Sequence, residues 1–476
     1  MISANQLPVA VLGAGPVGLA AAAHLLQRGL RPLIFERGDT VGANLASYRH
    51  VRLFSPWQYN IDKAARQLLE RSGWRSPPDD GLPTAGELLE QYLQPLAALP
   101  AMAQALQLGQ RVTRLTRQGF DKVKSRGREQ APFVVRVAGP DGERDVLVQA
   151  VIDATGTWSN PNPLGANGLP VLGETALAAR IAYGMPDVAG GERAAYAGKR
   201  TLVVGAGHSA AGTLLALADI AAATPGTSIV WAIRGEHLAR VFGGGTADGL
   251  PARGQLGMRL KALRDSGQLE LHTNFHITAV REAPGGLEVI GAVAHGGLAA
   301  ISGIDRIVCA TGARPDLELT REIRVRHDPW LESTDALAPL IDPNEHSCGT
   351  VRPHGHRELA HPEPGYYAVG AKSYGRAPNF LMATGYEQVR SVVARLAGDV
   401  AAADQVQLEL PETGVCSTQF AFQQAAAAAS GCCGGPAKAL ASACCALDET
   451  EKAQGRSGCA THSECRPGVK ASGCCA

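Results

Sequence analysis

The fold is decided by the sequence PVAVLGAGPVG, which occupies residues 8–18 of a chain of 476 residues. Its apolar first half predicts a short, buried parallel strand, and an alanine- and leucine-rich helix is expected over residues 19–27. The glycines between them follow the G-x-G-x-x-G pattern of a dinucleotide-binding turn. Gly13 permits the tight turn, Gly15 lets a pyrophosphate approach the backbone, and Gly18 lets the helix pack closely on the strand.

The next strand supplies the acidic residue that completes this pattern. Residues 32–35 predict a second strand, which ends at Glu36, and Arg37 follows it. A carboxylate at this place can accept hydrogen bonds from the ribose hydroxyls, and free N–H groups at the helix N-terminus favour the phosphates. Strand, glycine turn, helix and acidic strand end together predict a first Rossmann-like dinucleotide site.

A second unit of the same kind follows. RTLVV at residues 200–204 predicts a strand, and GAGHSA follows at 205–210, with Ala210 in the place of the third glycine. The next expected strand, residues 228–233, ends in Arg234, whose guanidinium can bind a 2′-phosphate that a carboxylate would repel. We therefore expect FAD as a resident cofactor in the first site and NADPH as the reductant in the second. A solvated strand-end charge is the alternative interpretation of Arg234.

Two similar segments, VIDATG at residues 151–156 and VCATG at 308–312, come after the two glycine loops. In this order, the motifs resemble those of the flavin-containing monooxygenase superfamily and its pyridine-nucleotide flavoreductase relatives over roughly residues 5–400. The resemblance implies that both segments return the chain from one nucleotide domain to the other, and that GYYAVG at 365–370 places a glycine near the flavin. The residues expected to contact the cofactors are Gly13, Gly15, Pro16, Gly18, Glu36, Arg37, Thr155, Gly156, Gly205, Gly207, Ser209, Ala210, Arg234, Thr311, Gly312 and Gly370.

The predicted fold is therefore α/β, with two Rossmann-like domains and the NADPH domain inserted into the FAD domain. We expect the FAD domain over residues 1–165 and 305–400, the NADPH domain over 166–304, and a flexible cysteine-rich tail over 401–476. A chain of this length is too long for one hydrophobic core and suits two or three domains.

One stretch departs from the monooxygenase pattern. Superfamily members carry a Phe, Gly, His and Tyr fingerprint before the second glycine loop, whereas this chain has no histidine between residues 172 and 183. That fingerprint belongs to the handling of NADP and oxygen, so its absence weighs against oxygen insertion. The sequence gives no clear catalytic residue. Asn160 is one candidate for shaping the flavin pocket, with stabilisation of a turn as the alternative.

The tail is distinguished by its cysteines. Nine of the chain's 11 cysteines fall between Cys416 and Cys475, and adjacent pairs of thiolates suit a soft centre such as trivalent arsenic, Cu(I) or Zn(II). The expected ligands are Cys432, Cys433, Cys444, Cys445, Cys474 and Cys475. CCGGPA at 432–437 is similar to the tails of flavoproteins from bacterial arsenic-resistance operons. Zinc, with His462, and an oxidisable tail without a ligand are the alternatives.

The composition of the chain limits the classes of partner that we expect it to bind. Lys and Arg number 45 against 44 Asp and Glu, so the formal net charge is +1, which argues against nucleic acid as a partner. The amino end lacks the pattern of a secretory signal, and no apolar stretch is long enough for a membrane span, so we expect a cytoplasmic protein. A homodimer is left open.

Three functions fit these features. The first is an FAD- and NADPH-dependent monooxygenase-like oxidoreductase that acts with O2 on a small molecule, an arsenical being the favoured example, and the cysteine tail binds the metalloid. The second is an NADPH-dependent flavin reductase that passes electrons to thiols, a metal or a quinone without oxygen insertion. The third is a metal chaperone or sensor that retains a nucleotide fold and is not an enzyme.

Overall fold

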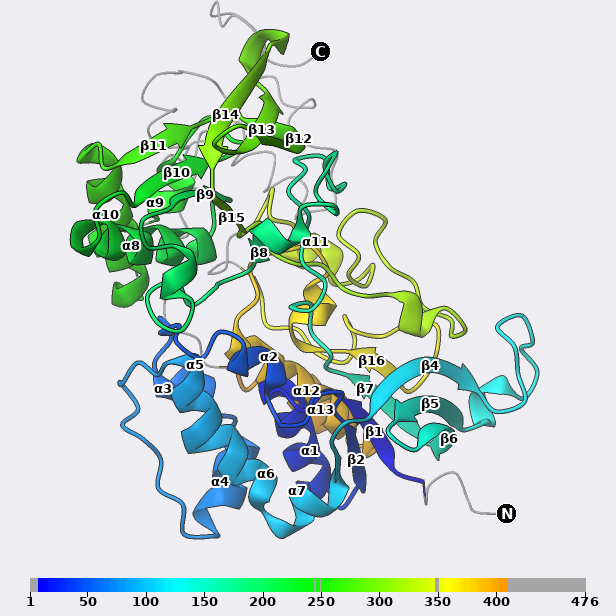
Figure 1. Cartoon of the computed structure of the whole chain (residues 1–476). Helices are drawn as coiled ribbons and strands as arrows, with labels where there is room; N and C mark the ends of the chain where they lie inside the picture. The colour runs from blue at the N-terminus through cyan, green and yellow to red at the C-terminus, as the bar shows by residue number, and fades with distance from the viewer. Residues whose placement is uncertain (1–6, 244, 249, 347–350, 409–476) are drawn as a thin grey trace, which may run out of the picture. The chain divides into compact units, whose positions relative to one another are not determined.

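The computed structural model describes residues 7–243, 245–248, 250–346 and 351–408. The proposed cysteine ligands, from Cys432 to Cys475, lie outside the described residues, as does Cys348. The described part of the chain contains two parallel sheets (Figure 1).

The first sheet has five parallel strands in the order β16-β7-β1-β2-β3. Its centre is β1 (Val9–Leu12), which pairs with β2 (Pro32–Phe35) and with β7 (Ala150–Asp153). The edges are β16 (Tyr366–Ala368) and β3 (Leu106–Gln107). Helix α1 (Pro16–Gln27) begins directly after the glycine turn, earlier than expected, because proline is well tolerated in the first helical turn.

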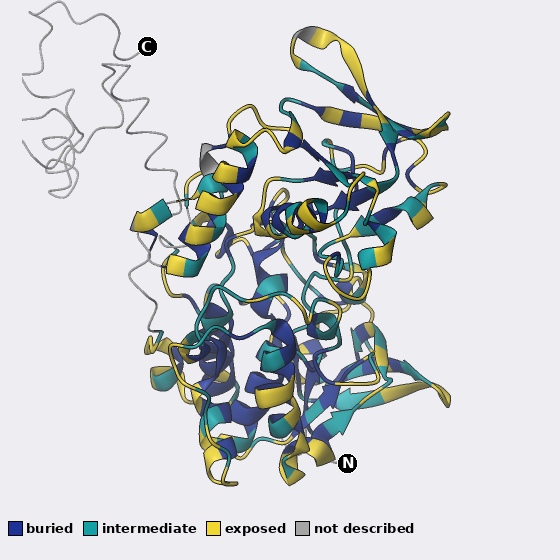
Figure 2. Ribbon diagram, turned by 60° about the vertical axis from the view of Figure 1, so that its left-hand side comes forward, coloured by how far each residue is buried: buried dark blue, intermediate teal, exposed yellow. Residues whose placement is uncertain are grey.

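Alternate residues of β1 point to opposite faces of this sheet, and each face has its own cover. Val9 and Val11 pack in one core with α1 and α12 (Met382–Leu396). Ala10 and Leu12 pack in another core with an antiparallel three-stranded sheet, β4-β5-β6 (Arg111–Arg117, Phe133–Gly139 and Gly142–Val148). The result is a three-layer arrangement whose middle sheet is buried on both faces (Figure 2).

The second sheet repeats this plan. Five parallel strands lie in the order β11-β10-β9-β15-β8 (Leu269–His272, Ser228–Ala232, Arg200–Val204, Arg306–Cys309 and Ile181–Tyr183). Val203 packs toward α8 (His208–Ala223) and α10 (Pro251–Asp265), and Leu202 packs toward the antiparallel sheet β12-β13-β14 (His276–Ala283, Gly286–Ala292 and Leu298–Ile304). The presence of two Rossmann-like units in one chain confirms the predicted α/β fold class.

The domain boundaries stay a proposal, with one adjustment. Strand β15 pairs with β9 and β8, so the second sheet extends beyond residue 304, where the return to the FAD domain was expected. The crossover back to the first sheet therefore begins after Cys309.

The chain between β2 and β3 is helical and forms one side of the first core. It contains α2 (Ala43–Ala46), α3 (Trp57–Asn60), α4 (Lys63–Glu70), α5 (Ala85–Leu88), η2 (Leu89–Leu93), α6 (Gln94–Ala98) and α7 (Pro100–Ala105). The remaining short elements are η3 (Arg128–Gln130), η4 (Ala178–Arg180), η5 (Arg193–Ala195), α9 (Ala239–Phe242), η6 (Gly245–Ala247), η7 (Ala294–Gly296), η8 (Glu318–Thr320), α11 (Ala338–Ile341), η9 (Gly370–Tyr374) and α13 (Val400–Asp404).

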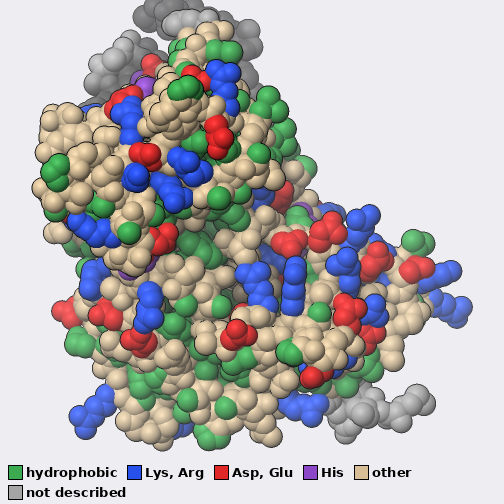
Figure 3. All heavy atoms as spheres, viewed as in Figure 1, with side chains coloured by type: hydrophobic (Ala, Val, Ile, Leu, Met, Phe, Trp, Pro, Cys, Tyr) green, Lys and Arg blue, Asp and Glu red, His purple; other side chains and the backbone are tan. Residues whose placement is uncertain are grey.

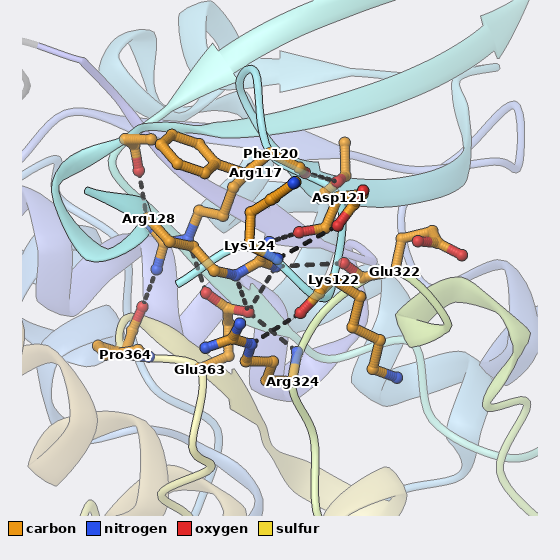
Figure 4. Close-up of polar contacts among 12 residues, drawn as sticks. Arg117, Phe120, Asp121, Lys122, Lys124, Arg128, Glu322, Arg324, Glu363 and Pro364 are labelled. Carbon is orange, nitrogen blue, oxygen red and sulfur yellow. Dashed lines mark hydrogen bonds and ion pairs between the residues drawn. The ribbon is translucent and has the colours of Figure 1, made fainter. Parts of the chain in front are cut away.

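A buried charge cluster fixes the β4-β5-β6 sheet to the end of the first domain (Figure 4). Glu363, just before β16, accepts hydrogen bonds from Arg117 Nε at 2.8 Å and from Arg128 Nη2 at 2.8 Å. All three side chains are at most 3% exposed. Burial acts to raise the pKa of Glu363, but the hydrogen bonds from Arg128 and Arg117 and the Arg324 amide hold it below its usual range.

The surface carries no strong bias of charge on the face seen in Figure 3, where lysines and arginines are interspersed with acidic residues. Within the described residues, no helix is both long enough and apolar enough to span a bilayer.

Candidate cofactor site

A cavity of about 1150 Å³ lies among the ends of both parallel sheets, and residues from both glycine loops line it. Such a volume exceeds that of a typical single-ligand pocket, which is roughly 300–1,000 Å³. The predicted contacts and candidates that line it are Gly13, Gly15, Pro16, Glu36, Arg37, Thr155, Gly156, Gly370, Ser209 and Asn160.

The first glycine turn has the geometry that the sequence predicted for it. Gly13 has φ +94°, and a Cβ there would lie 2.9 Å from the Ala154 carbonyl oxygen. A Cβ at Gly18 would lie 1.9 Å from the Gly13 carbonyl oxygen, so the helix can approach the turn only without a side chain. A Cβ at Gly15, by contrast, would meet nothing within 4 Å. This open space beside the N-terminus of α1 fits a pyrophosphate.

Glu36 stabilises the first glycine turn in addition to its expected role of binding ribose hydroxyls. Its Oε2 accepts the Ala14 amide at 2.8 Å, and its Oε1 accepts the Gly38 amide at 2.8 Å. A carboxylate has about four acceptor positions, so two remain for ribose hydroxyls. Arg37 is exposed and also lines the cavity.

The second glycine turn repeats the steric pattern of the first. Gly205 has φ +131°, and a Cβ there would lie 2.3 Å from the Ala310 carbonyl oxygen. A Cβ at Gly207 would meet nothing within 4 Å, and the methyl group of Ala210 is fully buried. Gly207 caps the N-terminus of α8, where free amides and the helix dipole favour a phosphate.

Other predicted contacts lie away from the cavity lining. Arg234 is exposed at the end of β10, and its backbone carbonyl contacts His276 Nε2 at 3.1 Å. Thr311 follows β15, and its hydroxyl lies 3.2 Å from the Asn162 carbonyl oxygen. Gly312, with φ +88°, turns the chain back toward the first domain. These residues remain proposed contacts.

Two side chains from different domains meet inside the cavity. Phe54 and His208 have ring centroids 5.0 Å apart, and both line the cavity. The surrounding walls desolvate His208, and this effect, together with the charge of Arg253, lowers the pKa of His208. The imidazole is therefore neutral near pH 7.

A second cavity of about 460 Å³ adjoins the first. Asn160, Asp316 and Glu318 line both cavities. The Asn160 side chain donates to the Pro315 carbonyl oxygen at 3.3 Å, which ties the segment after β7 (the first crossover) to the segment after β15 (the second crossover). A catalytic role for Asn160 stays a prediction.

The end of β7 and η9 share a buried ion pair that the sequence motifs did not single out. Lys372 Nζ lies 2.7 Å from Asp153 Oδ2, with the two side chains 3% and 0% exposed, and Lys372 lines the cavity. Burial acts to raise the pKa of Asp153, but the Lys372 ammonium and the hydrogen bonds from Lys372 and Thr155 hold it below its usual range. A lysine two residues beyond the expected flavin-proximal glycine was the available signal.

Cys309 occupies the corresponding place at the end of β15. It is 2% exposed, and burial raises the pKa of its thiol to about 11. A thiol with so high a pKa stays protonated at neutral pH and is a poor nucleophile. Among the described residues no cysteine lines the cavity, and no group of three or more His, Cys, Asp or Glu is placed to hold a metal ion.

Comparison with known proteins defines the class. The chain belongs to the pyridine nucleotide-disulphide oxidoreductase family, whose sequence profile matches residues 10–348. It is therefore a flavin-dependent pyridine-nucleotide oxidoreductase, an enzyme that uses FAD and NADPH. No curated protein matches the sequence.

Solved structures share the fold at low identity. The bacillithiol disulfide reductase from Bacillus cereus is 18% identical, with a TM-score of 0.61 over 82% of this chain and 99% of that one. The cadaverine monooxygenase of desferrioxamine biosynthesis from Erwinia amylovora is 13% identical, with a TM-score of 0.59 over 85% and 97%. The ornithine N-hydroxylase from Kutzneria is 14% identical, with a TM-score of 0.52 over 83% and 98%. These similarities show the fold alone.

Proposed function

We propose that this enzyme is an NADPH-dependent flavin monooxygenase that oxidises a soft, thiophilic substrate, an arsenical being the favoured example. The observation that carries the proposal is the cavity of about 1150 Å³, which residues of both glycine loops line and to which no described cysteine contributes. A single chamber of this kind can hold FAD, the nicotinamide and a small substrate together, without a dithiol relay between them.

The residues of the first turn are assigned to FAD. The open space at Gly15 and the N-terminus of α1 would receive the pyrophosphate, and the free acceptor positions of Glu36 would bind ribose hydroxyls. Bound FAD supplies the chemistry of hydride acceptance from NADPH and of oxygen activation. The chain's task is to place the reactants and to keep bulk water out.

The residues of the second turn are assigned to NADPH. Gly207 and Ser209, at the N-terminus of α8, would receive its pyrophosphate, and Arg234 would bind its 2′-phosphate. The contact between Phe54 and His208 closes part of the space between the two turns. A neutral His208 there leaves the chamber free of an extra positive charge.

The cysteines of the tail, rather than the residues that line the cavity, are the basis for the proposed substrate class. Pairs of cysteines such as Cys432 and Cys433 suit a trivalent arsenical, and a tethered thiol pair would raise its concentration near the flavin. The balanced reaction joins arsenite, O2, NADPH and a proton to give arsenate, NADP⁺ and water. These tail residues lie outside the described part of the chain.

The test is a stoichiometry measurement on the purified holoenzyme. With arsenite or a methylated trivalent arsenical, we expect NADPH, O2 and oxidised product in a ratio of about one to one to one, with little H2O2. The matched control lacks residues 416–476 and should retain the turnover number while needing more substrate to reach it. NADPH consumption that yields only H2O2 with every arsenical and thioether would contradict the proposal.

The same nine cysteines between Cys416 and Cys475 also favour a second function. In this alternative the enzyme is an NADPH-dependent reductase that passes electrons to thiols, and the similarity in fold to a bacillithiol disulfide reductase is compatible with it. Anaerobic assays separate the two. Disulfide reduction at a rate that matches NADPH oxidation under nitrogen would favour the reductase.

A further inference from the structure

Lys372 is a buried cation whose hydrogen bonds are incomplete within the described chain. Its ammonium group donates to Asp153 Oδ2 at 2.7 Å and to Thr155 Oγ1 at 3.1 Å. An ammonium group has three N–H donors, so one has no partner among the described residues. Lys372 is 3% exposed and lines the main cavity, so this donor has the cavity, rather than bulk solvent, in which to find an acceptor.

Asp153 cannot satisfy the third donor because its own acceptor positions are filled. Its Oδ1 accepts the Thr155 hydroxyl at 2.6 Å and the Thr155 amide at 3.2 Å. Its Oδ2 accepts the Tyr366 hydroxyl at 3.1 Å in addition to Lys372. The carboxylate, fully buried, holds the ammonium in one place.

A buried ammonium is stabilised only when its charge is paired and its remaining protons are bonded. The pair with Asp153 answers the first requirement, and a ligand oxygen in the cavity would answer the second. Lys372 lies in η9, whose first residue is Gly370, and a Cβ at Gly370 would lie 3.3 Å from Val17 Cγ2 in the first turn of α1. This places η9 against the first glycine turn, so the ligand is the one that the first turn binds.

We propose that Lys372 binds FAD directly, its third N–H donating to an oxygen atom of the cofactor, and that Asp153 and Thr155 position it. The inference rests on the assignment of FAD to the first site. The ribityl chain, the pyrophosphate and the flavin carbonyls all offer oxygen acceptors to a fixed cation.

The second crossover offers a contrast at the equivalent place. Cys309-Ala310-Thr311-Gly312 stands where the first crossover has Asp153-Ala154-Thr155-Gly156. The Cys309 thiol lies 3.2 Å from Thr311 Oγ1, and no cation among the described residues pairs with it. Of the two crossovers, only that of the site assigned to the resident cofactor has a buried charged pair.

The test compares FAD affinity in variants of the full chain. Apoprotein is titrated with FAD and the quenching of FAD fluorescence is followed, with NADPH affinity of the reconstituted protein and thermal unfolding of the apoprotein measured alongside. Lys372→Met should raise the dissociation constant of FAD about 10- to 100-fold, the range for a lost hydrogen bond to a charged group. NADPH affinity should not change.

Because Lys372→Met leaves Asp153 buried and unpaired, the double variant Asp153→Asn/Lys372→Met is the decisive protein. It removes both charges, which is often neutral for stability. We expect its apoprotein to unfold at the temperature of the wild type and its FAD affinity to fall as in the single variant. Cys309→Ser, at the equivalent position, should bind FAD normally.

A double variant that binds FAD within about twofold of the wild type would overturn the proposal. So would equal losses of FAD and NADPH affinity, or a loss of FAD affinity matched by an unfolded apoprotein, because those results describe a purely structural pair. This test does not depend on oxygen insertion, so its failure is distinguishable from failure of the monooxygenase proposal.

Discussion

The two dinucleotide units of this chain share their backbone geometry and differ in their electrostatics. In each, the first glycine of the turn lies against a crossover carbonyl, that of Ala154 in one unit and of Ala310 in the other. In each, the second glycine faces open space. The steric requirements of nucleotide binding are therefore met twice in the same way, and specificity has to come from the charged side chains around the turns.

The two units differ in charge at two corresponding places. A buried Glu36 follows β2 and an exposed Arg234 follows β10, and β7 and β15 end in Asp153 and the neutral Cys309. The first unit has a carboxylate that accepts hydrogen bonds from the Ala14 and Gly38 amides, so the chain itself fixes this part of the site. The second presents an exposed cation, which suits a ligand that enters and leaves. The contrast agrees with a resident FAD and an exchanging NADPH.

The antiparallel sheets of the two units also differ in how far their charged side chains are buried. The first, β4-β5-β6, is attached through the buried Glu363 cluster of Figure 4. The second, β12-β13-β14, carries instead the Arg281–Glu288 pair, whose arginine is 66% exposed. Buried and exposed ion pairs respond very differently to the loss of one partner.

The largest predicted effect comes from this pair of clusters. Glu363→Gln should lower the free energy of unfolding by about 3–5 kcal/mol, because it leaves two buried guanidinium groups without their counter-ion. Glu288→Gln, in the pair whose arginine is exposed and whose carboxylate is 19% exposed, should change it by less than about 1 kcal/mol. Urea denaturation of both variants measures the difference, and equal effects would remove the distinction between the two sheets.

The second prediction concerns the strand-end charges. Arg234→Ala should weaken NADPH binding about 10- to 100-fold and leave NADH binding unchanged, because only NADPH carries the 2′-phosphate. Steady-state kinetics with the two coenzymes measures this, and FAD content serves as the control. If Arg234→Ala weakens the binding of NADPH and of NADH equally, Arg234 does not bind the 2′-phosphate.

The third prediction uses the one steric difference between the turns. Gly18→Ala should lower the stability of the holoenzyme by about 1–3 kcal/mol, since its Cβ would lie 1.9 Å from the Gly13 carbonyl oxygen. Ala210→Gly, at the matching position, should cost only about 0.5–1 kcal/mol. Thermal unfolding in excess FAD gives both values, and a harmless Gly18→Ala would contradict the close packing.

The smallest effect concerns pH. Burial and the neighbouring His327 lower the pKa of His361 to about 4, whereas an unfolded histidine titrates near pH 6.5. Between these values the unfolded chain binds the extra proton, so stability falls as the pH decreases from about 6.5 toward 4. His361→Asn removes this titrating group. Between pH 8 and roughly pH 5.5, the free energy of unfolding of the variant should therefore fall by about 1 kcal/mol less than that of the wild type. His276→Asn, at an exposed histidine of the second unit, is the control and should lose stability as the wild type does. If both variants lose the same stability on acidification, the titration of His361 is not the cause.

The sequence was sufficient for the glycine turns and for the presence of two Rossmann-like units. Local rules fix these features: Gly13 needs a positive φ, Gly18 needs the absence of a side chain, and each turn lies between a strand and a helix. The pairing of Lys372 with Asp153 could not be predicted in the same way, because the residues are 219 positions apart. Their meeting depends on β16 pairing with β7, which is a tertiary event.

The boundary at residue 304 needed adjustment for a similar reason. Residues 306–309 have the composition of a buried strand in either sheet, and only their pairing with β9 decides the sheet to which they belong. Arg234 shows the converse case. Its position at a strand end was predictable, but the structure places it outside the cavity lining. The proposed contact with NADPH therefore requires that the 2′-phosphate extend beyond the cavity.

The central claim, that the first turn binds FAD and the second binds NADPH, is tested most directly by placing a side chain in each open space. Gly15→Val and Gly207→Val are a matched pair, because a Cβ at either position meets no protein atom within 4 Å and neither glycine has a positive φ. We expect Gly15→Val to be purified without FAD, whereas Gly207→Val should retain FAD that dithionite reduces and NADPH does not. Retention of FAD by Gly15→Val, or loss of FAD from Gly207→Val, would contradict the claim.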